Sequence, residues 1–263
     1  MMVNGDPQYK LSIITINLNN KEGLEKTARS IAIQTNKAFE WIVIDGGSDD
    51  GSTDVISNYE DLISYHIIEP DNGIFNAMNK GILNSHGEYL FFLNSGDALY
   101  EPDVLAKVLP LLKGDSIYIG KYVINNVLQE KDLSSNAHIC HTLLQTGLLH
   151  QTIFYNRMLF NRYGLYNESL KLCADWEFNV KTIIFGGEKV VVLPFITTDF
   201  APGGVSSFRE NLLIEEERVK DGNRNLWTIL DFYSEYGLLV EHVKKNFILR
   251  KLCVLYAKLC KWI

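Results

Sequence analysis

Four short apolar runs, each ended by polar or acidic residues, constrain the fold of this chain more than any other feature. They cover residues 11–16, 41–44, 65–68 and 89–93. Between them, apolar residues recur at helical spacing, as Leu24, Ala28 and Ile31 do. This alternation of strand and helix predicts an α/β fold with a mostly parallel, doubly wound central sheet that is flanked by helices.

The polar strand ends carry the candidate site, because ligands of open α/β sheets collect at the carboxyl ends of the strands. Asp45 directly follows one apolar run, and Asn94, Ser95 and Asp97 follow another. A single Asn-Ser-Gly-Asp segment is equally typical of an ordinary turn. Four polar ends on one edge, however, predict an acidic crevice. Carboxylate and neighbouring oxygen ligands suit Mg2+ or Mn2+, and such a cation suits a diphosphate.

Charge, cysteine spacing and hydropathy exclude several classes of protein. The chain has 263 residues and a formal net charge of −7, which argues against a nucleic-acid-binding protein. Its four cysteines show no CxxC spacing and no disulfide framework, as expected for a reducing compartment. We see neither a signal peptide nor an apolar run long enough to span a bilayer, so we expect a cytoplasmic protein. The dinucleotide and Walker A glycine motifs are missing too, so a nucleotide would be held in another way.

Four motifs make the first hundred residues resemble the nucleotide-sugar half of an inverting family 2 glycosyltransferase, which has a GT-A (Rossmann-like) fold. The motifs cover residues 12–19, 44–53, 79–82 and 87–97. The Asp-Gly-Gly-Ser form at 45–48, together with segment 69–80, is similar to a branch that acts in bacterial exopolysaccharide and O-antigen assembly. The resemblance implies transfer of a sugar from a UDP-sugar, with inversion, to a hydroxyl of a glycan or lipid-linked glycan.

The resemblance also implies roles for individual residues of the nucleotide-sugar half. Asp45 matches the aspartate that reads the uracil, and Gly47 lets the backbone approach a ligand closely. Ile16 and Leu18 match positions that pack on the base, although the family more often has an aromatic residue at position 18. The segment that flanks the nucleotide contributes two further residues: Asp71 and Lys80.

The family's Asp-x-Asp region departs from the usual pattern here. Asn94 and Gly96 replace aspartates, which leaves Asp97 as the ligand for Mn2+ or Mg2+. Asn94 would turn to ribose or phosphate, with Ser95 beside the nucleotide-sugar. Asp199 is a weaker second candidate for the metal. One fewer carboxylate predicts weaker metal binding.

Segment 173–178 is the second part of the chain to which we assign chemistry. Asp175 could cap the helix that follows, and the resemblance gives it the role of general base. The two roles are compatible, because a helix N-terminus favours the ionised carboxylate that a base needs. The resemblance places His150, Gln151 and Trp176 on the acceptor side, although His150 is equally well explained as a hydrogen-bonded residue at a strand end.

We expect one catalytic domain over residues 1–220, with a nucleotide-sugar half over about 9–100 and an acceptor half over about 101–220. Residues 221–263 would form a C-terminal helical extension. Residues 241–263 hold six Lys or Arg against one Glu. Long basic side chains there could lie on an anionic inner leaflet while apolar neighbours enter the interface, which would make the protein peripheral at the plasma membrane. Packing on the catalytic domain or in a homodimer is the alternative.

Two other functions remain open at this point. A sugar-1-phosphate nucleotidyltransferase uses a similar half-sheet, but it would need a Gly-rich, basic loop after the first strand, and residues 17–21 do not supply one. A non-catalytic nucleotide-sugar-binding protein would accommodate the missing aspartates. Steady release of UDP from a UDP-sugar would exclude it.

Overall fold

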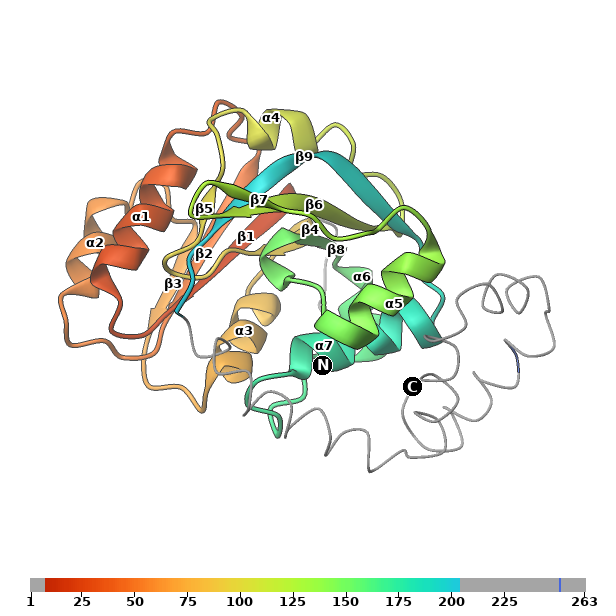
Figure 1. The fold of residues 1–263 in the computed structure, drawn as a ribbon. Coiled ribbons are helices and arrows are strands. Elements are labelled where there is room, and N and C mark those ends of the chain that lie inside the picture. The colour runs from red at the N-terminus through yellow and green to blue at the C-terminus, as the bar shows by residue number, and fades with distance from the viewer. Residues whose placement is uncertain (1–7, 204–250, 252–263) are drawn as a thin grey trace.

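The computed structural model describes residues 8–203 and residue 251, and these are built around one sheet (Figure 1). The strand order is β3-β2-β1-β4-β8-β6-β9-β5, with β7 paired to β6. The strands are β1 (Tyr9–Asn17), β2 (Phe39–Asp45), β3 (Tyr65–Ile68), β4 (Gly87–Phe92), β5 (Ala98–Leu99), β6 (Ile117–Ile124), β7 (Val127–Gln129), β8 (Ile153–Asn156) and β9 (Val190–Phe200). The helices are α1 (Lys21–Ala32), α2 (Ser52–Asn58), α3 (Ile74–Leu83), α4 (Val104–Val108), α5 (Asn136–Thr146), α6 (Met158–Tyr163) and α7 (Ala174–Asn179). A 3-10 turn, η1 (His150–Thr152), precedes β8, and a π-helical turn, η2 (Val180–Phe185), continues α7.

The first half of the sheet confirms the α/β prediction. Strands β3, β2, β1 and β4 pair in parallel, and their connections run through α1, α2 and α3. The register aligns Asn17 at the end of β1 with Asp45 at the end of β2. Two predicted site strands therefore end side by side.

The second half of the sheet mixes directions. β8 runs antiparallel to β4 and β6, whereas β9 is parallel to β6. The sequence predicts separate strands over residues 117–120 and 122–124, and again over 190–194 and 195–200. The structure has one continuous strand in each place, β6 and β9. The pairing of β6 with β9 shifts register around Lys121, between the two predicted parts of each strand. At Gly120 the strands approach so closely that a Cβ atom would lie 2.1 Å from Thr197 Oγ1.

Each face of the sheet has its own apolar core, because successive side chains of a strand point to opposite faces. Phe91 packs with Trp41 on the face that α1, α2 and α4 cover. Phe92 packs with Tyr155 and Phe178 on the face that α3, α5, α6 and α7 cover. Figure 1 shows α1 and α2 together at one side, and α5, α6 and α7 grouped at the other. The site lies where the strand ends meet these helices.

The predicted halves of the catalytic domain share this single sheet. The predicted C-terminal extension, residues 221–263, lies outside the described residues apart from Lys251. Among the residues that the structure describes, no helix is long and apolar enough to cross a membrane.

Candidate active site

The end of β2 is organised by Asp45, whose carboxylate is fully buried. Its Oδ1 accepts hydrogen bonds from the backbone N–H groups of Gly47 (3.0 Å) and Ser48 (2.7 Å). Its Oδ2 accepts from Asn17 Nδ2 (2.7 Å) and from Ser48 Oγ (2.8 Å). A carboxylate offers about four acceptor positions. All four positions of Asp45 are filled by protein groups, three of which belong to the loop after β2. Sequence reasoning named Asp45 but missed Asn17 and Ser48 as its partners.

The loop after β2 meets the loop after β3 at Gly46. A Cβ atom on Gly46 would lie 2.7 Å from Asp71 Oδ2 and 3.2 Å from Leu18 Cδ1. The structure thus brings Asp71 and Leu18 to the Asp45 loop; their role in binding a nucleotide stays a prediction. Leu18 is exposed, and Gly47 has a φ of 86°, which favours glycine.

Lys80 and Ile16 stand at the border of this group. Lys80 Nζ lies 2.8 Å from Glu69 Oε1 and donates to the Pro70 carbonyl, so it pins the loop after β3. Ile16 is half-buried, and its carbonyl accepts from the Ser95 N–H at 3.1 Å. This bond ties the end of β1 to the segment after β4.

The segment after β4 is fixed from both sides. Asn20 Nδ2 donates to the carbonyl of Ser95 at 3.1 Å. Thr27 Oγ1, on α1, accepts from the Gly96 N–H (3.0 Å) and donates to the Asp97 carbonyl (2.6 Å). Gly96 has a φ of 105°. An aspartate in its place would be strained, which accounts physically for this departure from the Asp-x-Asp pattern.

Asp97 is the last residue of this segment, directly before β5, and is 3% exposed. Its Oδ1 accepts from the Ala201 N–H at 2.9 Å. Burial raises the pKa of Asp97 to about 6, although Ala201, His150 and Gln151 act in the opposite direction. Asp199, the weaker metal candidate, is ion-paired to Lys26 at 2.9 Å.

The donor atoms around Asp97 fit a hard divalent cation. The described residues contain no cluster of three or more His, Cys, Asp or Glu side chains that would hold a metal unaided. Two buried amide oxygens, Asn94 Oδ1 and Gln151 Oε1, have no hydrogen-bond partner there. One carboxylate supplemented by neutral oxygens and by substrate phosphates is a usual environment for Mg2+. The fit therefore rests on Asp97 and on the ligand's own oxygens.

Asp175 reaches the same region from the far side of the sheet. His150 Nδ1 lies 2.8 Å from Asp175 Oδ2, and His150 Nε2 lies 3.1 Å from Asn94 Nδ2. The three residues come from α7, η1 and the end of β4. The acceptor-side histidine thus joins the predicted base to the donor-side strand end.

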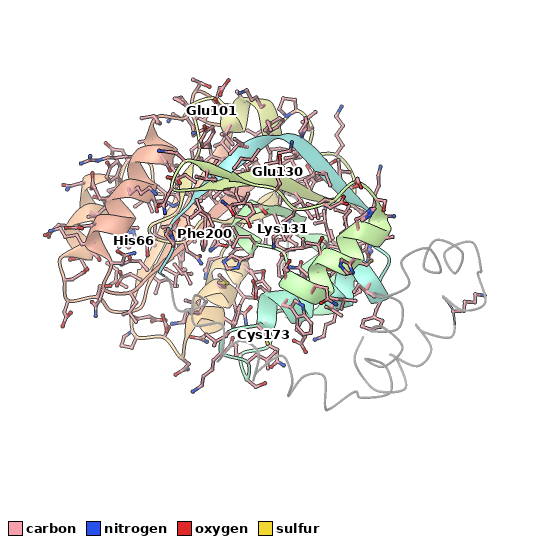
Figure 2. The ribbon with its side chains drawn as sticks, viewed as in Figure 1. His66, Glu101, Glu130, Lys131, Cys173 and Phe200 are labelled. Atoms are coloured by element: carbon pink, nitrogen blue, oxygen red, sulfur yellow. The ribbon has the colours of Figure 1, made fainter. Side chains whose placement is uncertain are left out.

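Asp175 is not the cap of its helix, contrary to one of the two roles considered above. The cap position is Cys173, labelled in Figure 2, and it makes no side-chain capping bond. Asp175 lies in the first turn and is bonded to His150 instead. Its carboxylate is therefore used for a tertiary contact.

Two neighbours of these residues face the interior. Trp176 is 4% exposed, and its indole N–H donates to the Leu143 carbonyl at 2.9 Å, so it packs α7 on α5. Gln151 is buried as well, and its carbonyl accepts from Thr198 Oγ1 at 2.7 Å. Both side chains pack in the interior next to the site, and neither offers an exposed surface to an acceptor.

Sequence reasoning missed a hydrogen-bonded clamp between α3 and the loop before α7. Asn79 Nδ2 donates to the Tyr166 carbonyl (2.9 Å) and to Glu168 Oε1 (2.8 Å), and Asn79 Oδ1 accepts from the Tyr166 N–H (3.0 Å). Asn76 Nδ2 donates to Glu168 Oε2 at 2.9 Å. Two asparagines three residues apart lie on one helix face, which was the available signal.

Comparison with known proteins identifies the family. The Glycosyl transferase family 2 model matches residues 12–169. The chain belongs to this family. A PGL/p-HBAD biosynthesis glycosyltransferase of Mycobacterium bovis is 29% identical over 225 residues, which are 80% of this chain and 82% of the relative. An uncharacterised glycosyltransferase of Mycobacterium tuberculosis is 30% identical over 206 residues, or 76% and 78% of the two chains.

Solved glycosyltransferase structures share the GT-A fold of this chain. Residues 1–349 of S. aureus TarS in complex with UDP match with a TM-score of 0.62 and 18% identity, over 80% of this chain and 65% of that one. The chain covers 40% of the longer TarS structure. A mannosyltransferase from Pyrobaculum calidifontis in complex with GDP-Man and Mn2+ matches with a TM-score of 0.57 and 15% identity, over 98% and 81% of the two chains. This family 2 member is thus a glycosyltransferase by fold and by relatives.

Proposed function

We propose that this enzyme transfers a sugar from a UDP-sugar to a hydroxyl of a glycan or lipid-linked glycan, with inversion at the anomeric carbon. The observation that carries the proposal is the chain of contacts from Asn94 through His150 to Asp175. It brings a carboxylate of the acceptor half next to the strand end at which a donor diphosphate is expected. A general base needs this position between donor and acceptor.

The reaction would proceed as a single displacement. Asp175 takes the proton of the acceptor hydroxyl while that oxygen bonds to the anomeric carbon. The bond from the anomeric carbon to the diphosphate oxygen breaks, and UDP leaves with the electron pair. Because attack comes from the face opposite the leaving group, the configuration inverts. The proton on Asp175 then passes to solvent.

Asp97 would hold Mg2+ or Mn2+, and the bound cation supplies positive charge to the diphosphate. The Mn2+ complex of the Pyrobaculum mannosyltransferase supports the use of a divalent cation. Asn94 would accept a hydrogen bond from a ribose hydroxyl through its unpartnered Oδ1, since an amide oxygen has no proton to offer a phosphate. Ser95 lies next to it in the segment.

The uridine preference rests on the family resemblance and on TarS, which is described in complexes with UDP and with UDP-GlcNAc. Because the four acceptor positions of Asp45 are filled within the protein, we propose that Asp45 acts by fixing residues 46–48 beside the base. Leu18, Ile16 and Asp71 would line the same pocket, and Lys80 would hold its outer loop.

Calorimetry of UDP binding, with and without Mg2+, tests the donor side. We expect binding that Mg2+ strengthens in the wild type and a loss of the Mg2+ effect in Asp97→Asn. UDP release from UDP-glucose, UDP-galactose and UDP-N-acetylglucosamine, with alkyl glycosides as acceptors, tests catalysis. Asp175→Ala should abolish transfer and keep UDP affinity within about twofold. UDP affinity lost in Asp175→Ala would make the residue structural, and no UDP binding by the wild type would overturn the uridine assignment.

Attachment to an anionic membrane through residues 241–263, of which the structure describes only Lys251, stays a prediction, and so does formation of a homodimer. Sedimentation with phosphatidylserine vesicles tests the first. Replacing Lys251 and Lys258 by Glu in the full chain should reduce binding, because each basic residue near an anionic surface contributes about 1 kcal/mol. Equal binding to neutral phosphatidylcholine vesicles would contradict it.

A further inference from the structure

The ring of His150 is held at both of its nitrogens. Nδ1 lies 2.8 Å from Asp175 Oδ2, and Nε2 lies 3.1 Å from Asn94 Nδ2. Only 13% of the side chain is exposed, against 16% for Asp175. The ring therefore cannot turn without giving up two hydrogen bonds in a largely desolvated place, where unpaired polar groups are costly.

The partners define what each nitrogen does. A carboxylate only accepts hydrogen bonds, so Nδ1 carries a proton and donates it to Asp175. Asn94 Nδ2 only donates, so Nε2 is the acceptor on the other side. The ring is thus the Nδ1–H tautomer, with its orientation set from the end of β4.

This arrangement leaves one oxygen at each end of the chain of contacts. The hydrogen bond to Asp175 occupies Oδ2, and no described residue donates to its Oδ1. At the other end, Asn94 Oδ1 is buried without a hydrogen-bond partner among the described residues. The two unpartnered oxygens lie on opposite sides of His150, one in each half of the domain.

We propose that His150 is a positioning residue that couples the donor-side Asn94 to the base Asp175. By holding Oδ2, His150 directs Oδ1 of Asp175 to the acceptor hydroxyl. By accepting from Asn94, it fixes which way the Asn94 amide faces, so that Oδ1 of Asn94 is presented to the donor. The inference rests on the proposed function, because it gives Asp175 the role of base.

The expected size of the effect follows from the role. Outer residues that orient a reacting group are worth about 10–100-fold in activity. A displacement of about 1 Å in a reacting group costs a similar factor. Loss of the His150–Asp175 bond should therefore lower kcat about 10–100-fold and leave the KM for the donor within a few-fold.

Two substitutions separate the two bonds. In His150→Asn, the amide nitrogen reaches the position of Nδ1 and can still donate to Asp175. In His150→Gln, the longer side chain reaches the position of Nε2 and can still contact Asn94. We expect His150→Asn to keep kcat within about threefold, and His150→Gln to show the full loss of kcat with UDP affinity unchanged. Equal kcat in the two variants would overturn the proposal, whether both are active or both are impaired with intact folding.

A spectroscopic readout tests the geometry without turnover. In 15N-histidine NMR of the full chain, with His150→Gln to assign the signal, we expect a protonated Nδ1 and an unprotonated Nε2. Asp175→Ala should shift the Nδ1 signal, and Asn94→Ala should shift the Nε2 signal. An Nε2–H tautomer would overturn the proposal. If the tautomer is as expected but the wild type releases no UDP from any of the three UDP-sugars, the proposed function fails and the coupling geometry stands.

Discussion

Asn79 and Tyr166 are joined by two reciprocal hydrogen bonds, from Asn79 Nδ2 to the Tyr166 carbonyl (2.9 Å) and from the Tyr166 N–H to Asn79 Oδ1 (3.0 Å). The side chain of Asn79 thereby imitates a neighbouring strand. Tyr166 packs on Phe92 and Phe178, with ring centroids 5.5 and 5.4 Å away. Helix α3 is thus held by these hydrogen bonds against the loop that leads to Asp175.

We expect Asn79→Ala to destabilise the fold by about 3 kcal/mol, because it leaves the buried N–H and carbonyl of Tyr166 unpaired. Asn76→Ala is the matched control, since it removes only exposed hydrogen bonds, the one to the same Glu168 and the one from the Asn72 N–H, and should cost less than about 1 kcal/mol. Urea denaturation of both variants measures the difference. Equal losses would mean that the clamp does not depend on the Tyr166 backbone.

Thr27 connects α1 to the segment that carries Asp97, and it does so through its hydroxyl. Thr27→Val removes the acceptor of the Gly96 N–H and the donor to the Asp97 carbonyl, so we expect a loss of about 1–3 kcal/mol. Mg2+-dependent UDP binding should weaken too, because the segment that carries Asp97 is then held less firmly. Thr27→Ser keeps the hydroxyl and should restore both properties. A Ser variant as impaired as the Val variant would assign the effect to packing.

Asn17 and Asp45 offer a test by exchange. Asp45→Asn puts an amide nitrogen against Asn17 Nδ2 or against a backbone N–H, two donors facing each other, and should cost about 1–3 kcal/mol. Adding Asn17→Asp supplies an acceptor for that nitrogen. The double variant should therefore recover at least about 1 kcal/mol relative to the sum of the single variants in a double-mutant cycle. Additive losses would show that the two side chains are not coupled.

The sequence was sufficient to predict the first half of the fold. The four apolar runs and the helical spacings of α1 and α3 are local patterns, and parallel strands in this order bring the ends of β1, β2 and β4 to one edge. The proximity of Asp71 and Leu18 to the Asp45 loop follows from that arrangement of strand ends. No contact between residues distant in sequence was needed to predict this half of the fold.

The second half depends on contacts that no local pattern reveals. Helix α5 was not predicted, because its apolar side is short and its start is marked only by Ser135, which accepts from the His138 N–H. The bond between His150 and Asp175 joins residues 25 apart, and the Asn79 clamp joins residues 87 apart. Such pairs are set by how the helices pack on the sheet. The cap interpretation of Asp175 was wrong for the same reason, since its carboxylate was needed by a distant histidine.

The ionised carboxylate of Asp97 should make the folded enzyme less stable at neutral pH than a neutral side chain at this position would. Its pKa is raised to about 6, so between about pH 4 and pH 6 the folded chain holds a proton that the unfolded chain has released. Stability contributed by this group is therefore present at low pH and is lost as the pH rises through this window. A shift of about two pKa units corresponds to roughly 3 kcal/mol. Asp97→Asn should remove this loss. In urea denaturation at about pH 4.5, 6 and 7.5, its gain in stability over the wild type should be small at the lowest pH and nearly complete at the two higher values.

Asp115→Asn, which removes an exposed carboxylate, is the control for the change in net charge, and it should leave the pH dependence as it is in the wild type. The gain in Asp97→Asn should come with a functional cost, because the amide no longer offers an anionic ligand to Mg2+. In the wild type, Mg2+ should compete with the proton on Asp97, so the Mg2+ effect on UDP affinity should grow as the pH rises through about 6. An Asp97→Asn protein that is no more stable than the wild type at pH 7.5 would show that burial does not disfavour the ionised carboxyl. One that keeps the full Mg2+ effect would show that Asp97 is not the metal ligand.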